Sequence, residues 1–207
     1  MDRGLCRDLV AKPARGRGVT PGQFIATSLR DPAGVARRLT AVALPSGILW
    51  QMAALVTILS VLVLELGLLL SPTEASMVAA SPFTLCVILG SSLVMMVAAI
   101  FWTGRMIGGQ GRFAAAILLI VWWQGMALVI QVVQTVALLL FPPLAGIVTL
   151  AGLAWLVFAL LHLVNVLHGF DSLLKSLGTV VIGVLGISFG LALLLALIGV
   201  TLQGGTL

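Results

Sequence analysis

The sequence predicts an all-α, polytopic membrane protein with five transmembrane helices, preceded by short amphipathic helices. Composition is the first observation behind this prediction: of the 207 residues, 61% are hydrophobic and only 8% are charged. A soluble globular domain is typically about 25% charged, so a soluble fold could not bury this much apolar surface. The second observation is that the apolar residues gather in five long runs. Each run reaches the length of about 20 residues that a helix needs to cross a bilayer.

The first 47 residues divide into a tail and a helical segment. Residues 1–19 are basic and show no hydrophobic periodicity, so we expect a disordered tail. Residues 20–47 are expected to form two short helices. The pairs Thr20-Pro21 and Asp31-Pro32 each place a capping side chain before a proline at the first helical position, which is a typical helix start.

The second of these helices is amphipathic. Val35, Leu39 and Val42 fall on one stripe, and Arg37 and Arg38 lie off it. Such a helix can lie along the membrane surface, where anionic lipid attracts its arginines. It can equally pack on its own protein, with arginines that only set the orientation of the chain. The sequence leaves both readings open.

Five predicted spans and a short tail make up the rest of the chain. The spans are residues 48–70, 83–102, 113–140, 144–167 and 177–202. Together they form a transmembrane domain over residues 48–202. Pro142 and Pro143 separate the third and fourth spans in a tight turn, which predicts an antiparallel hairpin. Residues 203–207 are an uncharged tail.

The basic residues indicate how the protein is oriented. Eight of the eleven Lys and Arg residues precede Ile48, two lie between the second and third spans, and Lys175 lies between the fourth and fifth. All eleven therefore fall on one side, which the positive-inside rule makes cytoplasmic, with an external C-terminus. This distribution also argues against nucleic acid as a partner. Nine arginines against two lysines are typical of a GC-rich coding sequence, so we expect a bacterial cytoplasmic membrane.

A few polar side chains interrupt the spans and are the candidate intramembrane site. Glu65 is the one acidic residue within a predicted span, and Gln124, Gln131 and Gln134 lie in the third span. An intramembrane carboxylate is a functional candidate by default, but Glu65 can also be a structural residue that faces the bundle. The amides can line a polar pathway or hydrogen-bond between helices. Because Glu65 and Gln131 lie at nearly the same depth, we expect a hydrogen bond from Glu65 to Gln131 or Gln134.

The sequence gives little sign of catalytic or metal chemistry. His162 and Asn165 lie three residues apart near the end of the fourth span, with His168 close by. A metal site would need a further ligand, preferably a carboxylate, so we expect neither a metal nor another cofactor. The His-Glu-x-x-His motif of metal hydrolases does not occur in the sequence, and no predicted span contains an aspartate. We therefore expect a protein that is not an enzyme.

Two motifs and the five-span pattern together resemble the Yip1 family. Segment 30–39, Arg-Asp-Pro-Ala-Gly-Val-Ala-Arg-Arg-Leu, precedes the first span, and segment 108–113, Gly-Gly-Gln-Gly-Arg-Phe, enters the third. The latter is close to the family's Gly-Gly-basic-Gly-Ser-Phe pattern, with Gln110 and Arg112 at its basic and serine positions. Segment 167–170, Leu-His-Gly-Phe, is a weaker match.

The resemblance covers residues 28–200, and in the glycine loop it rests on Gly108, Gly109, Gly111 and Phe113. It implies a non-enzymatic integral membrane protein that acts in membrane organisation or protein interaction. The expected partners are membrane lipids and either a membrane protein or a second copy of the chain. The alternative is a small transporter or channel subunit that uses Glu65 and the amides of the third span.

Overall fold

The computed structural model describes residues 21–70 and 81–198, and the regular structure of these residues is helical throughout. Two short helices precede five long ones. The helices are α1 (Pro21–Arg30), α2 (Pro32–Ala41), α3 (Ser46–Leu70), α5 (Pro82–Met106), α6 (Phe113–Leu140), α7 (Pro142–His168) and α8 (Leu173–Ile198). The five long helices are long and apolar enough to cross a membrane, which confirms the predicted all-α, polytopic class. The predicted tails, residues 1–19 and 203–207, lie outside the described residues.

Some helices extend beyond the predicted apolar spans. The second span was expected to end at Trp102, whereas α5 continues to Met106, and α8 begins at Leu173 rather than at residue 177. Pro142 and Pro143 belong to the first turn of α7 instead of forming a separate turn. Proline is tolerated there because the first backbone N–H groups of a helix have no intrahelical acceptor. The ends of these helices are therefore set by capping interactions. An apolar run in the sequence marks only the part of a helix that can lie in the hydrocarbon of the bilayer.

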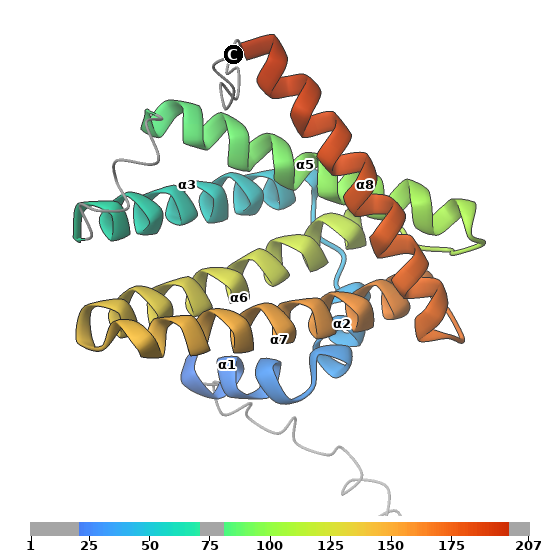
Figure 1. The fold of residues 1–207 in the computed structure, drawn as a ribbon. Helices are drawn as coiled ribbons and strands as arrows, with labels where there is room; N and C mark the ends of the chain where they lie inside the picture. Colours follow the sequence, from blue (N-terminus) through green and yellow to red (C-terminus); the bar gives the residue numbers. More distant parts are fainter. Residues whose placement is uncertain (1–20, 71–80, 199–207) are drawn as a thin grey trace, which may run out of the picture.

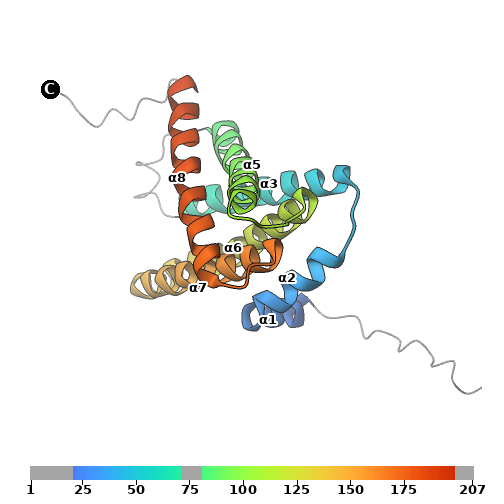
Figure 2. The same cartoon turned by 90° about the vertical axis from the view of Figure 1, so that its right-hand side faces the viewer.

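The long helices form a layered bundle. Helices α6 and α7 make an antiparallel hairpin, α3 packs on α6, and α5 packs against both α3 and α8. Helix α8 crosses the others obliquely (Figure 1). Viewed from the end of the bundle, α5 and α8 lie on one side of the α6–α7 hairpin, and α1 and α2 lie on the other (Figure 2).

Apolar side chains fill the bundle and also cover it. The most deeply buried ones come from α3, α5, α6 and α7, and include Leu49, Val97, Ala116, Leu119, Leu163 and Val164. On the outside, Leu174 and Phe189 of α8 are about three-quarters exposed, at 74% and 75%. An apolar exterior on every long helix is the surface that lipid requires.

The two short helices pack along the bundle. Asp31 caps α2, because its carboxylate accepts a hydrogen bond from the Gly34 amide at 2.7 Å. Helix α2 contacts α7 and α6 and buries Val35 there. The Trp155 indole N–H donates to the Leu29 carbonyl of α1 at 3.0 Å. Trp155 lies halfway along α7, about 20 Å from either end, so α1 lies beside the middle of that helix (Figure 1).

Of the two readings of the amphipathic helix, the structure has the one in which it packs on its own protein. Arg37 and Arg38 nevertheless remain exposed, because they project from the face of α2 opposite Val35 and Ala36. An apolar groove of about 420 Å³ lies where α1 and α2 meet α3 and α6. Gly125 lines this groove, and a Cβ added to it would meet no atom within 4 Å.

Candidate functional site

The family-motif loop and the end of α7 form one compact junction around the imidazole of His168. Gly104 at the end of α5 and Gly109 and Gly111 in the following loop all lie against this side chain. The His168 ring is 2% exposed. Three glycines from one connection therefore enclose a histidine that lies about 60 residues further along the chain.

The glycines are needed here for space and for backbone conformation. A Cβ on Gly104 would collide with His168 Nε2, and a Cβ on Gly109 would lie only 2.5 Å from His168 Cδ2. Gly108 has a φ of 93°, and Gly169, directly after His168, has a φ of 64°. Both φ values lie in the left-handed region that favours glycine. The loop therefore both turns tightly and packs closely against the end of α7.

Hydrogen bonds join the loop to α7. The backbone N–H of Gln110 donates to the backbone carbonyl of His168 at 3.2 Å. The backbone N–H of Gly109 donates to the carbonyl of Gly104 at 2.8 Å. His168 Nδ1 lies 3.2 Å from the Val164 carbonyl, and since a carbonyl can only accept, this nitrogen carries a hydrogen. Gln110 thus satisfies one of the carbonyls that a helix leaves without a partner at its C-terminus.

Aromatic side chains complete the junction. Phe113, which begins α6, meets Phe101 of α5 edge to face, with ring centroids 5.2 Å apart. The guanidinium carbon of Arg105 lies 5.4 Å from the centre of the Phe101 ring, within the range of a cation–π contact. Phe170 stacks on His168 with centroids 5.2 Å apart. The junction therefore joins the ends of α5, α6 and α7 into one unit.

The polar residues near the end of α7 have structural partners. His162 Nδ1 lies 2.9 Å from the Phe158 carbonyl, and the rings of the two residues lie with centroids 4.2 Å apart and planes tilted by 46°. The Asn165 side-chain oxygen accepts a hydrogen bond from the Ser176 hydroxyl of α8 at 3.3 Å. Among the described residues, no group of three His, Cys, Asp or Glu side chains is placed to hold a metal ion.

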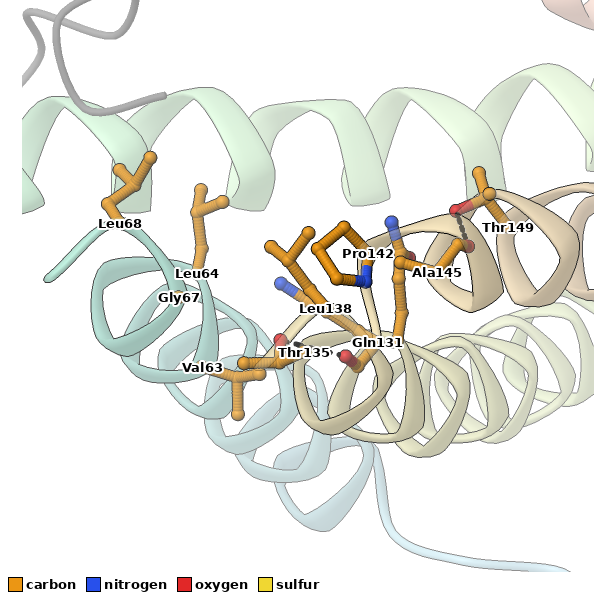
Figure 3. Close-up of a pocket in the computed structure, with 12 residues that line it drawn as sticks. Val63, Leu64, Gly67, Leu68, Gln131, Thr135, Leu138, Pro142, Ala145 and Thr149 are labelled. Atoms are coloured by element: carbon orange, nitrogen blue, oxygen red, sulfur yellow. Dashed lines mark hydrogen bonds between the residues drawn. The ribbon is translucent and has the colours of Figure 1, made fainter. Parts of the chain in front are cut away.

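A second site lies at the opposite end of the bundle, between α3 and the α6–α7 hairpin. It is a pocket of about 560 Å³ lined by twelve residues (Figure 3). Gln131, Gln134 and Thr135 of α6 form its polar wall, and leucine and valine side chains of α3 face them. Gln131 lies nine residues before the end of α6, or about 13 Å along the helix axis. The pocket is thus within the membrane-spanning part of the bundle.

Glu65 does not join the amides, and the predicted hydrogen bond is wrong. The structure records none between Glu65 and Gln131 or Gln134, and Glu65 is not part of the pocket lining. Equal depth is not sufficient, because each residue turns a helix by about 100°. Leu64 lines the pocket, whereas Glu65 lies on the stripe of Ile58, which lines a separate recess shared with α5.

The amides of α6 are only partly brought together. Gln131 and Gln134 share the pocket, but Gln124 does not line it. Gln124 is seven residues before Gln131, which places it about 10 Å closer to the junction end of the bundle. Of the three candidate amides, only Gln131 and Gln134 therefore lie together, at one end of the bundle. The sequence also missed His168 as the centre of the junction, although the Leu-His-Gly-Phe segment was a signal for it.

Comparison with known proteins identifies the family. No curated protein and no solved structure matches the chain. The model of the Yip1 domain matches residues 26–195, which include the second half of α1, all of α2, the glycine loop and the five long helices up to residue 195. The match therefore includes the glycine loop and the Leu-His-Gly-Phe segment, which meet at the His168 junction. The chain therefore belongs to the Yip1 domain family.

Proposed function

We propose that the protein is a non-enzymatic organiser of a bacterial cytoplasmic membrane, which acts through contacts of its N-terminal helices with lipids and membrane proteins. This proposal rests on how the α1–α2 pair packs on the bundle and on the exposure of its two arginines. It is held on the bundle by apolar packing and by the Trp155 hydrogen bond. Arg37 and Arg38 are exposed and form no ion pair within the described residues.

Unpaired guanidinium groups on an ordered helix are suited to anionic partners. Each arginine near an anionic membrane surface contributes about 1 kcal/mol, and planar guanidinium groups can also bind carboxylates in two-point fashion. The junction supports this role, because it fixes the ends of α5, α6 and α7 relative to α2, whose Ala36 belongs to the same buried cluster as Leu167 and Phe170. The proposal includes a cytoplasmic N-terminus, so that these arginines face the anionic leaflet.

The packing between α3 and α6 gives less support to a transporter or channel subunit. The amide pocket occupies one end of this interface. Towards the other end the interface is apolar, with Leu49, Ala53 and Val56 buried on α3 and Ile117 and Leu118 buried on α6. An ion pathway needs polar or charged groups along its length. Within the described residues, the polar wall does not continue across the bundle.

The test compares two charge-reversal pairs in the full chain. Arg37→Glu with Arg38→Glu should reduce recovery of cross-linked membrane proteins and co-purified anionic lipid roughly tenfold. Arg112→Glu with Lys175→Glu is the matched control, since both residues are exposed and basic but neither belongs to α1 or α2. Equal recovery for the two pairs would contradict the proposal. So would solute flux through liposomes containing the purified protein, above that of protein-free liposomes.

A further inference from the structure

The amide pocket has hydrogen-bonding capacity that the protein itself does not use. The side-chain amides of Gln131 and Gln134 make no hydrogen bond within the described residues. The Thr135 hydroxyl donates to the backbone carbonyl of Gln131 at 3.0 Å, and the Thr149 hydroxyl donates to the backbone carbonyl of Ala145 at 2.8 Å. These hydroxyls can therefore still accept. Two amides supply four N–H donors and two carbonyl acceptors, and hydrocarbon cannot satisfy them.

The pocket is neutral as well as polar. None of its twelve lining residues is charged, and Glu65 is not among them. A phosphate or carboxylate would enter without a counter-charge, which is costly at this depth. A group with hydroxyls that both donate and accept matches the amides and the threonine oxygens without bringing a charge.

The opposite wall of the pocket is apolar. Val63, Leu64 and Leu68 of α3 line the pocket on the side away from α7, and Leu138 of α6 lines it as well (Figure 3). A free polyol would leave these side chains against a polar molecule. An amphiphile satisfies both walls, with its hydroxyls on α6 and the start of its acyl chain along α3. The volume of about 560 Å³ lies within the usual range for a small-molecule site.

From these observations we propose that the pocket binds the hydroxyl-bearing headgroup of a neutral lipid from the surrounding bilayer. Gln131 and Gln134 hydrogen-bond the hydroxyls, and the leucine and valine side chains of α3 hold the proximal part of the acyl chain. The site is independent of the proposed function, because Arg37 and Arg38 lie on α2 and line no part of this pocket.

The test uses the full chain in phosphatidylcholine nanodiscs that contain about one mole per cent of a monoacylglycerol with a photoreactive acyl chain. Cross-links should fall on residues of α3 and of the α6–α7 hairpin that line the pocket. Unlabelled monoolein should compete for labelling, whereas methyl oleate, which has the same chain without hydroxyls, should not. Equal competition by methyl oleate would show that the chain alone partitions there and would overturn the proposal. If free glycerol reduced labelling at the same concentration as monoolein, the hydroxyl-bearing ligand would not need to be a lipid, and the proposal would be overturned.

Two glycines provide matched variants. A Cβ at Gly146 would meet no atom within 4 Å, and Gly146 lines the amide pocket, so Gly146→Leu should fill it and lower labelling about tenfold. Gly125→Leu is the control, since Gly125 is equally open but lines the apolar groove instead. Gln131→Met with Gln134→Met keeps side-chain size but removes the hydrogen bonds, and should also lower labelling about tenfold. Labelling of either test variant at the wild-type level, with unchanged thermal unfolding, would refute the site.

Discussion

The steric fit between Gly104 and His168 can be tested quantitatively with a double-mutant cycle. Gly104 lies in the last turn of α5, where a Cβ would collide with the His168 ring. Inserting a methyl group into a packed interior costs about 1–3 kcal/mol, while alanine improves helix propensity over glycine by up to about 1 kcal/mol. We therefore expect Gly104→Ala alone to lower the free energy of unfolding by about 1–2 kcal/mol.

The second arm of the cycle removes the ring. In the His168→Ala background nothing opposes the added methyl group, so Gly104→Ala should raise the unfolding free energy by up to about 1 kcal/mol. The coupling energy should then be about 2–3 kcal/mol. Equilibrium unfolding of the full chain in mixed micelles, followed by circular dichroism, measures all four proteins. Gly186→Ala is the control, because Gly186 of α8 is open on the outside. A Gly104→Ala effect that is the same in both backgrounds would refute the steric account.

Three further predictions follow from the bundle. Trp155→Phe removes one hydrogen bond of about 1 kcal/mol between α7 and α1, so spin-label distances between these helices should broaden, and an unchanged distribution would show that the bond contributes nothing. Reporter fusions after Gly108 and Ser172 should be cytoplasmic and a fusion at Leu207 external; a cytoplasmic Leu207 would exclude the predicted orientation. Glu65→Leu should change monoacylglycerol labelling less than about twofold, since Glu65 lies outside the pocket, and a tenfold loss would place it back among the amides.

The fold class and the starts of the two short helices could be predicted because they depend on local sequence. A run of apolar residues fixes the length of a span without reference to its neighbours. Asp31 followed by Pro32 predicted a cap, and the carboxylate of Asp31 does accept a hydrogen bond from Gly34. The prediction for Glu65 failed for the opposite reason. It compared depth along two helices, whereas contact also depends on how each helix is rotated, and rotation is set by the packing of the whole bundle.

The amides of α6 also show that local sequence does not determine how two helices pack against each other. The sequence identified three candidate amides on α6, and two of them, Gln131 and Gln134, line one pocket. Which side chains of α3 lie opposite them depends on the packing of the two helices, and these are apolar. The glycines of α8 give a second example. Gly190 packs near the sulfur of Met95 on α5, but Gly186 is open, and Gly183 lies against Ala99 instead. Glycine permits close helix packing, and the rotation of α8 about its axis determines which of these glycines lie against α5.

The junction explains how the chain can depart from the family pattern and still keep its architecture. The glycine motif and the Leu-His-Gly-Phe segment are two parts of one steric unit, since the glycines leave the space that the His168 ring fills. Gln110 enters this unit through its backbone amide, and its side chain is exposed. Arg112 is also exposed, and it precedes α6 without capping it through its side chain. The two positions that differ from the family therefore contribute no side chain to the junction, so the packing around His168 does not depend on which residues occupy them.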